Sequence, residues 1–244
     1  LYTRLVRFEP ESIVAAAIER LARNKVFMKR LMYTLLHRSF LDRMAARFLN
    51  GWLALRDLRL LGAEKSSAKD DDSLVIQPVD QFGEEFNLLW EKVSPHYPVL
   101  VKRDSTYLTW KYTRQPFVEY TPFLAKRGDE VCGSLILRFG KPPERYVGVI
   151  ADLFVQPQDE ATVMALLTFA VRYFQKAKVK DIVAATSVRS YQKCYEALGF
   201  KPVKEAFPMF HCQVDHPEYK VALEPTSWFL GKGDHDWDQY PLTR

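Results

Sequence analysis

The sequence predicts an α/β domain, in which helices flank a sheet, preceded by a helical segment. The main observation is that residues 147–200 alternate between apolar strand runs and apolar residues at helical spacing, as a strand–helix–strand–helix unit does. A second observation is the helical spacing of apolar residues across 9–59. Between the two, residues 63–73 are small, polar and charged, which indicates a linker. We therefore assign a basic helical segment to 1–62 and the domain to 74–244.

The composition is that of a globular protein. Hydrophobic residues make up 48% of the 244 residues, which is ample for a packed core. The three cysteines form no Cys-x-x-Cys pair, so the sequence favours neither a disulfide framework nor a cysteine zinc site and fits a reducing cytoplasm. No apolar run approaches the roughly 18 residues of a membrane-spanning helix, and no signal peptide is recognisable. Because the chain begins at Leu1, we expect it to be part of a longer protein.

The positive charge is concentrated at the N-terminal end. Residues 1–60 contain 12 Lys and Arg against 5 Asp and Glu, whereas the rest of the chain carries a net charge of −2. A nucleic-acid-binding protein carries its basic patch on the folded domain. We therefore expect no nucleic acid among the partners of this domain.

The helical segment at 9–59 combines a wide apolar stripe with basic residues off the stripe. In the interpretation that we favour, its helices pack the stripe on a neighbouring protein domain. In the alternative, the segment makes a peripheral contact with an anionic membrane, as helices with a basic face and Phe, Trp and Leu opposite do. The stripe consists of Phe27, Met28, Leu31, Met32, Leu35, Phe40, Leu41, Met44, Phe48, Leu49 and Trp52.

Each element of the domain has its own signal. Pro116 stops a helix that begins at Arg103, and Gly128 with Asp129 marks the turn of a hairpin. Gly199 ends the last helix, since glycine adopts the left-handed conformation that closes a helix. In chain order, the predicted elements are strand 74–80, helix 82–94, helix 103–116, two hairpin strands, strand 147–155, helix 160–179, strand 181–186, helix 190–200, a strand near 203–214 and a C-terminal segment 226–238.

This order of elements, together with the Tyr-x-x-x-Gly-Phe motif that ends at Phe200, resembles the GNAT superfamily of N-acetyltransferases over residues 74–238. Two shorter segments, RDSTYLTWK from Arg103 and WFLGKGDHDWD from Trp228, are similar to a branch of bacterial GNAT proteins. Proteins of that branch often carry another GNAT-like domain upstream. The resemblance therefore implies an upstream GNAT-like domain as a partner within the intact protein.

The resemblance implies a mixed, mostly antiparallel sheet in which two parallel strands splay apart at their C-terminal ends. It also implies transfer of an acyl group, most simply acetyl, from acetyl-CoA or another acyl-CoA to an amine of a small molecule or peptide. In that mechanism Asp152 would deprotonate the amine, and Tyr195 would protonate the departing thiolate. Backbone amides of the splayed strand, at Leu153, Phe154 and Val155, would hold and polarise the thioester.

In such a fold, the helix at 103–116 would roof the cleft for the acceptor. Packing of its two aromatic rings in the interior is the alternative. The residues that we predict to contact the acceptor are Arg103, Asp104, Tyr107, Trp110 and Lys111.

Structural alternatives stand beside the chemical assignments. A buried aspartate is costly unless it is paired, so Asp152 equally suits a salt bridge or a helix-capping contact. Tyr195 lies four residues before the glycine that ends its helix, where a core residue is natural. The acids between Gly233 and Asp238 have the composition of a metal site without the spacing of a known one. There we expect a polar strand end and no metal.

The loop at 155–163 departs from the family. GNAT enzymes hold the pyrophosphate of coenzyme A on a Gln/Arg-x-x-Gly-x-Gly/Ala loop at the start of the central helix, where backbone N–H groups and the helix dipole face it. Here the loop has neither glycine nor arginine, and Asp159 and Glu160 would cap the helix and repel a diphosphate. Val188 stands where the family usually has asparagine. This predicts weak or absent coenzyme A binding and leaves a second function open: a non-catalytic GNAT-fold module that binds a partner domain or a substrate.

Overall fold

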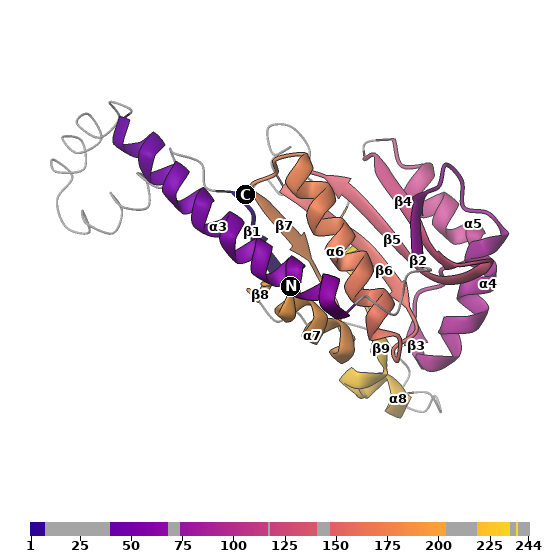
Figure 1. Cartoon of the computed structure of the whole chain (residues 1–244). Helices are drawn as coiled ribbons and strands as arrows, with labels where there is room; N and C mark the ends of the chain where they lie inside the picture. Colours follow the sequence, from indigo (N-terminus) through magenta and orange to yellow (C-terminus); the bar gives the residue numbers. More distant parts are fainter. Residues whose placement is uncertain are drawn as a thin grey trace, which may run out of the picture.

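The computed structural model describes a sheet, the helices around it and most of their connections (Figure 1). The predicted elements within 9–39 and 204–218 lie outside the described residues, as does most of the predicted linker. The described residues are 1–7, 40–67, 74–116, 118–140, 147–203, 219–234 and 238.

Seven strands form one sheet in the order β2-β4-β5-β6-β7-β1-β8. Every neighbouring pair is antiparallel except β6 and β7, which are parallel. This confirms the predicted mixed, mostly antiparallel sheet. The strands are β1 (Tyr2–Leu5), β2 (Leu74–Pro78), β4 (Tyr120–Arg127), β5 (Glu130–Phe139), β6 (Val147–Val155), β7 (Asp181–Ala184) and β8 (Lys201–Pro202), and a second, parallel pair joins β3 (Val99–Leu100) to β9 (Trp228–Phe229).

The four predicted helices of the domain, at 82–94, 103–116, 160–179 and 190–200, agree with the observed ones to within a few residues. Helix α3 ends eight residues beyond the predicted end of the helical segment at 59, and α8 was not predicted. The predicted helix at 103–116 is a short α-helix that continues as one π-helical turn. The α-helices are α3 (Phe40–Ser67), α4 (Glu84–Val93), α5 (Ser105–Leu108), α6 (Glu160–Lys176), α7 (Arg189–Ala197) and α8 (Tyr219–Leu223). The short helical turns are η2 (Ser94–His96), η3 (Thr109–Thr113, the π turn), η4 (Pro225–Ser227) and η5 (Lys232–Asp234).

Strand β1 comes from the start of the chain and lies between β7 and β8, which belong to the end of the domain. The sequence assigned these residues to the segment before the domain, and the structure places them in its sheet. The two inward side chains of β1 are Tyr2 and Arg4, both buried. An arginine at an inward position conceals the apolar alternation by which a strand is recognised.

Helix α3 is attached to this edge of the sheet through a buried ion pair. Arg4 Nη2 lies 2.6 Å from Asp57 Oδ1, and Arg4 Nε donates to the carbonyl oxygen of Leu198 at 2.7 Å. Gln175 of α6 donates to the second carboxylate oxygen of Asp57 at 2.5 Å. The helix continues to Ser67, inside the stretch that the sequence assigned to the linker. Polar contacts therefore hold β1, α3, α6 and α7 together.

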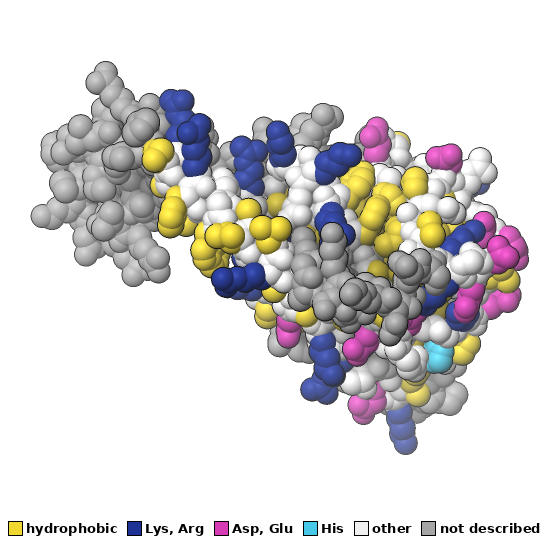
Figure 2. All heavy atoms as spheres, in the orientation of Figure 1, with side chains coloured by type: hydrophobic (Ala, Val, Ile, Leu, Met, Phe, Trp, Pro, Cys, Tyr) yellow, Lys and Arg dark blue, Asp and Glu magenta, His cyan; other side chains and the backbone are white. Residues whose placement is uncertain are grey.

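The outer face of α3 exposes large apolar side chains between basic ones (Figure 2). Leu53, on the inner face, is buried. The predicted contact of this segment with protein or with an anionic membrane stays a prediction. The exposed apolar side chains on α3 are Met44, Phe48, Trp52, Leu55 and Leu58.

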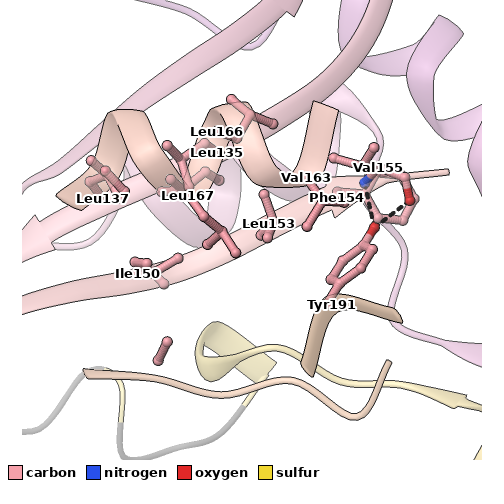
Figure 3. Packing of buried hydrophobic residues seen from close by; sticks show 14 of the residues in the cluster. Leu135, Leu137, Ile150, Leu153, Phe154, Val155, Val163, Leu166, Leu167 and Tyr191 are labelled. Atoms are coloured by element: carbon pink, nitrogen blue, oxygen red, sulfur yellow. Dashed lines mark hydrogen bonds between the residues drawn. The ribbon is translucent and has the colours of Figure 1, made fainter. Parts of the chain in front are cut away.

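The main apolar layer lies between α6 and the central strands. Val163, Leu166 and Leu167 of α6 are fully buried and face Leu135 of β5 and Leu153 of β6 (Figure 3). These contacts follow from the apolar stripe that predicted the helix. Burying a leucine side chain stabilises a fold by about 1.5–3 kcal/mol, so the buried leucines of this layer each contribute on that scale.

Two predicted glycine turns are confirmed. Gly128 joins β4 to β5 with a φ of 58°, and Gly199 follows α7 with a φ of 81°. Both values lie in the left-handed region that side chains with a Cβ rarely adopt. After Gly199, the backbone N–H of Phe200 donates to the carbonyl oxygen of Tyr195 at 3.0 Å, and the two rings pack edge to face. Gly199 thereby closes the helix that carries a predicted catalytic residue.

Candidate functional site

The parallel strands β6 and β7 separate toward their C-terminal ends, as predicted. They pair only from Val147 with Asp181 to Ile150 with Ala184. Beyond this point β6 continues to Val155 without β7. At the point of separation the register with β5 shifts, so that one residue of β6 has no partner on β5. A bulge of this kind re-aims a strand and is common beside active sites.

The gap between the two strands is occupied by the chain itself. Residues 228–234, here called the C-terminal insert, pass beside the end of β7. Ser187 N–H donates to the carbonyl oxygen of Leu230 at 3.0 Å, and Leu230 N–H donates to Ser187 Oγ at 2.8 Å. Gly231 comes so close to β6 that a Cβ there would lie 3.1 Å from Asp152 Oδ1 and 3.7 Å from the carbonyl oxygen of Ala151. The insert therefore lies between the strands, and glycine permits the close approach.

The backbone N–H and carbonyl groups of Val155, the last residue of β6, form hydrogen bonds with a side chain. The Tyr191 hydroxyl accepts a hydrogen bond from Val155 N–H at 2.8 Å and donates one to the carbonyl oxygen of the same residue (Figure 3). Tyr191 is buried and packs against Phe229 of the insert, with ring centroids 6.1 Å apart. Leu153 N–H, another amide predicted to hold the donor, donates to Asp152 Oδ1 at 3.1 Å. These amides are thus engaged within the chain.

Asp152 belongs to a buried charged triad. Arg103 Nε lies 3.0 Å from Asp152 Oδ2, and Arg103 Nη2 lies 2.5 Å from Asp234 Oδ2. The guanidinium carbon is 4.5 Å from the ring centroid of Phe229 and 5.5 Å from that of Phe154. Burial raises the pKa of Asp152 while Arg103 opposes the rise. Burial alone would lower the pKa of Arg103, but the two carboxylates raise it.

The geometry around Asp152 is that of the salt bridge weighed from the sequence. Its carboxylate is 3% exposed and is held by a guanidinium. A general base must reach the proton that it abstracts. Its role as a base stays a prediction, which requires release from Arg103.

Tyr195 lies deep in the core. Its ring stacks on Tyr2 of β1 with centroids 5.4 Å apart and packs edge to face on Phe200 at 5.0 Å. Burial raises the pKa of its hydroxyl. This is the position of a core residue, and the predicted role of Tyr195 as a general acid stays a prediction.

The start of α6 is capped by its own carboxylate. Asp159 accepts hydrogen bonds from Thr162 N–H at 3.0 Å and from the Thr162 hydroxyl at 2.7 Å. Arg127 donates to the same side chain at 3.1 Å. Burial would raise the pKa of Asp159, but the bonds from Arg127 and Thr162 lower it. The helix end that would bind a diphosphate thus already carries an anion, in agreement with the expectation from the sequence.

The predicted acceptor-binding residues divide between interior and surface. Asp104 caps α5 by accepting from Tyr107 N–H at 2.8 Å. Tyr107 packs beside Trp110, with ring centroids 5.5 Å apart, and Trp110 is 53% exposed. Arg103 and Lys111 are buried. Arg103 and Asp104 therefore precede α5, the other three residues lie on α5 and η3, and the five do not line one surface.

Sequence reasoning missed two acid–arginine contacts of the C-terminal acids. Asp234 joins the triad of Arg103, and its Oδ2 also accepts from Gly231 N–H at 2.7 Å. Asp238 lies 3.1 Å from Arg138 and accepts from the Tyr120 hydroxyl at 2.7 Å. The sequence does show Asp234 and Asp238 after Gly233. It gives no indication that their partners are Arg103 and Arg138, which lie far away in the chain. Among the described residues, no group of His, Cys, Asp and Glu side chains has the arrangement of a metal site.

The mixed sheet, its splayed parallel pair and the flanking helices agree with the fold that the resemblance implies. No family model matches the sequence, and no curated protein matches it. Three similar solved structures are a probable acetyltransferase from Staphylococcus epidermidis, an IAA acetyltransferase from Bacillus cereus and a Bacillus subtilis acetyltransferase in complex with CoA.

The similarity to these structures is partial. The first is 15% identical and the match covers 54% of this chain and 85% of that chain, with a TM-score of 0.42. The second is 20% identical, and the match covers 54% of this chain and 79% of that chain, with a TM-score of 0.40. The third is 18% identical, and the match covers 52% of this chain and 76% of that chain, with a TM-score of 0.37. Among the helices that the structure describes, none combines the length and the apolar character needed to cross a membrane.

Proposed function

We propose that this chain is a non-catalytic GNAT-fold module that binds a partner domain or a ligand and does not itself transfer an acyl group. The position of the C-terminal insert between β6 and β7 carries this proposal. In the mechanism that the resemblance implies, the thioester of an acyl-CoA is held by the backbone amides of the splayed strand, at Leu153, Phe154 and Val155, beside this gap. Here Gly231 approaches the backbone of β6, and Phe229 packs on Phe154 with ring centroids 5.3 Å apart. The donor would have to displace a packed segment of the chain.

Two further observations support the proposal. The N-terminus of α6 already holds the Asp159 carboxylate, so a diphosphate at that position would meet a like charge. The residue predicted as the base, Asp152, is paired with a buried arginine. The carboxylate of Asp159 opposes binding of the acyl donor, and the ion pair of Asp152 opposes removal of a proton from the amine.

Acyl transfer is the second candidate, and the bulge of β6 at the point of separation favours it. In this candidate the insert leaves the gap and acetyl-CoA or another acyl-CoA enters. The amine nitrogen attacks the thioester carbonyl, and its proton passes to Asp152. The C–S bond breaks, and the thiolate takes a proton from Tyr195.

A calorimetric titration of the full chain with acetyl-CoA separates the two candidates. The proposal expects no saturable binding up to about 1 mM, which corresponds to a binding free energy weaker than about −4 kcal/mol. Saturable binding at micromolar concentration would overturn it.

The variant Phe229→Ala sharpens this test, because it loosens the insert. If the donor displaces the insert, the variant should bind acetyl-CoA more tightly than the wild type. The proposal expects no binding in either protein. Leu88→Ala, which truncates an exposed side chain on α4, serves as the matched control.

A further inference from the structure

The outer face of α3 exposes a row of large apolar side chains, here called the outer row (Figure 2). Phe48 is 79% exposed, Leu58 70% and Leu55 61%. Exposed apolar patches of this kind mark contacts with proteins or with membranes. We propose that the outer row lies on an anionic membrane surface. This inference goes beyond the proposed function and does not depend on it. The outer row consists of Met44, Phe48, Trp52, Leu55 and Leu58.

The opposite side of α3 is already occupied by the domain. Leu53 is 2% exposed, and the carboxylate of Asp57 pairs with Arg4 of β1. At about 3.6 residues per turn, Phe48 and Leu55 lie on the side of the helix opposite these buried side chains. The domain therefore holds α3 with the outer row turned toward the surroundings.

The exposed charges beside the outer row are all positive. Arg43, Arg47 and Arg59 are exposed, whereas Asp57, the only acid between residues 43 and 60, is buried. The helical repeat places Arg43 and Arg47 on one side of the row and Arg59 on the other. Figure 2 shows basic side chains on both sides of the apolar ones. Within 43–60, cations therefore flank the row and no exposed carboxylate offsets them.

On one side of the row, a hollow brings two arginines next to apolar side chains. Its volume is about 230 Å³, and no carboxylate of a described residue lines it. Arg56 is held there because its Nη2 donates to the carbonyl oxygen of Leu5 at 2.9 Å. A lipid phosphate can accept hydrogen bonds from the guanidinium groups of such a hollow while the lipid chain contacts its apolar wall. The hollow is lined by Trp52, Leu55, Arg56, Arg59 and Leu60.

The residues outside the described part of the chain do not reverse this charge. Counted from the sequence, residues 1–73 contain 14 Lys and Arg against 9 Asp and Glu. Residues 8–39, which precede α3, contain 6 against 3. Four of the acids and two lysines follow the outer row, at 61–73. The whole N-terminal part is therefore cationic, whichever of its residues lie near the row.

The combination of side chains favours a bilayer over a globular partner. Phe, Trp and Leu next to basic residues are typical of helices that lie in the interface of an anionic bilayer. Arginine side chains are long enough to reach the headgroups while the apolar side chains enter the acyl boundary. A globular partner would need carboxylates matched to the arginines on both sides of one helix, whereas an anionic bilayer offers phosphates along its whole surface.

Flotation of the full chain with vesicles tests the proposal. One set of vesicles contains phosphatidylcholine and phosphatidylserine, and the other contains phosphatidylcholine alone. We expect binding to the anionic vesicles that is stronger than to the neutral ones and that weakens as salt is added, because salt screens the attraction. A chain that stays in solution with anionic vesicles at low ionic strength would overturn the proposal.

Single substitutions at exposed positions locate the contact. Leu55→Gln should lower the vesicle affinity at least about fivefold, since it removes apolar surface from the acyl boundary. Its matched control is Leu88→Gln on α4, where the leucine is 54% exposed. Arg47→Gln should lower the affinity about fivefold, and Arg114→Gln, at the exposed arginine after η3, is its control. If both α3 variants bind as the wild type does, the contact lies elsewhere and the assignment to α3 is wrong.

A spectroscopic measurement reports the contact without requiring loss of binding. Brominated acyl chains quench the fluorescence of a tryptophan that reaches them, and Trp52 and Trp110 are exposed to similar extents, 56% and 53%. Trp52→Phe keeps an apolar ring and should remove most of the quenching, whereas Trp110→Phe should retain it. Quenching that persists in Trp52→Phe would contradict the proposal.

A second copy of the chain on the same face would give a different result. Sedimentation velocity without vesicles would then show a dimer that Leu55→Gln dissociates, and that outcome would overturn the membrane assignment. None of these measurements uses acetyl-CoA. Failure here is therefore distinguishable from failure of the proposed function, which only saturable binding of acetyl-CoA contradicts.

Discussion

The two faces of β6 carry different kinds of side chain: one face is apolar, and the other includes a buried ion pair. On one face, the side chains of Val155 and of Leu166 on α6 both lie close to Gly133 of the neighbouring strand. On the other face, Asp152 pairs with Arg103, and Phe154 stacks on Trp90 of α4 with ring centroids 6.1 Å apart. Side chains of a strand alternate between faces, so four consecutive residues supply both. One face adds apolar burial, whereas the other holds charges whose burial must be compensated.

The faces also differ in where their partners come from. The apolar face is completed by α6, which begins five residues after β6 ends. The charged face depends on Arg103 and on Asp234, which are 131 residues apart in the chain. Costly groups are retained where a function uses them, so the charged face is where we expect ligands. Four substitutions test this contrast, from the largest expected effect to the smallest.

Arg103→Met removes the only cation of the triad. Asp152 and Asp234 would then be buried without a partner, and breaking a buried ion pair in this way costs about 3–5 kcal/mol. We expect that loss in the free energy of unfolding, measured with urea at about pH 7. Lys92→Met, which removes an ion pair with the exposed Glu130, should change the free energy of unfolding far less than Arg103→Met does.

The pH dependence of this loss distinguishes charge from packing. Burial raises the pKa of Asp152 above its unfolded value of 3.8, and loss of Arg103 removes the opposing effect. A carboxyl with a raised folded pKa contributes stability that is complete below the unfolded value and is lost as pH rises through the folded value. Arg103→Met should therefore destabilise less at about pH 4 than at about pH 7. An equal loss at both would mean that only the packing of the arginine side chain matters.

Gly148→Ala disturbs the apolar face instead. A Cβ at this position would lie 2.6 Å from ring atoms of the buried Phe174. Overpacking of a core costs roughly 1–3 kcal/mol, and the closeness of this contact favours the upper end. Gly51→Ala in α3, where no atom lies within 4 Å of the new Cβ, is the control and should gain up to about 1 kcal/mol. The loss at Gly148 should not change with pH, in contrast to that of the triad.

Tyr191→Phe tests the edge where the two faces meet. The change leaves the buried N–H of Val155 without its acceptor, at a cost of about 1–3 kcal/mol, and we expect about 2. Tyr173→Phe, which alters a half-buried ring on α6, should change stability by less than about 0.5 kcal/mol. Faster hydrogen exchange at the Val155 amide would locate the effect. Unchanged exchange there would show that the tyrosine hydroxyl is not its acceptor in solution.

Local hydrophobic periodicity predicted the strand and the helix that form the apolar face. The features that sequence analysis missed depend on contacts between residues far apart in the chain. Strand 147–155 was predicted at its observed bounds and the helix at 160–179 within three residues, because each is a single run of matching periodicity. The insert could not be predicted, since its contact with Ser187 joins segments more than forty residues apart. Strand β1 was missed because Arg4 occupies a core position. The sequence indicated that burial of Asp152 is costly unless the carboxylate is paired, but it did not identify Arg103 as the partner.

The smallest predicted effect concerns the cap of α6, a charged contact at the start of the helix that covers the apolar face. Asp159→Ala removes the acceptor of the Thr162 N–H and hydroxyl bonds, and loss of an N-cap costs about 1 kcal/mol. The pKa of Asp159 is lowered by Arg127 and Thr162 despite its partial burial. A carboxylate with a lowered folded pKa contributes stability that is present above the unfolded pKa and is lost as pH falls through the folded value. The wild type should therefore lose its advantage over the variant as pH falls from the unfolded value of 3.8 through the lowered folded value, which is opposite in direction to the effect at Asp152. Urea unfolding of both proteins across this range measures it, and a constant difference down to acid pH would mean that the carboxylate charge does not stabilise the helix.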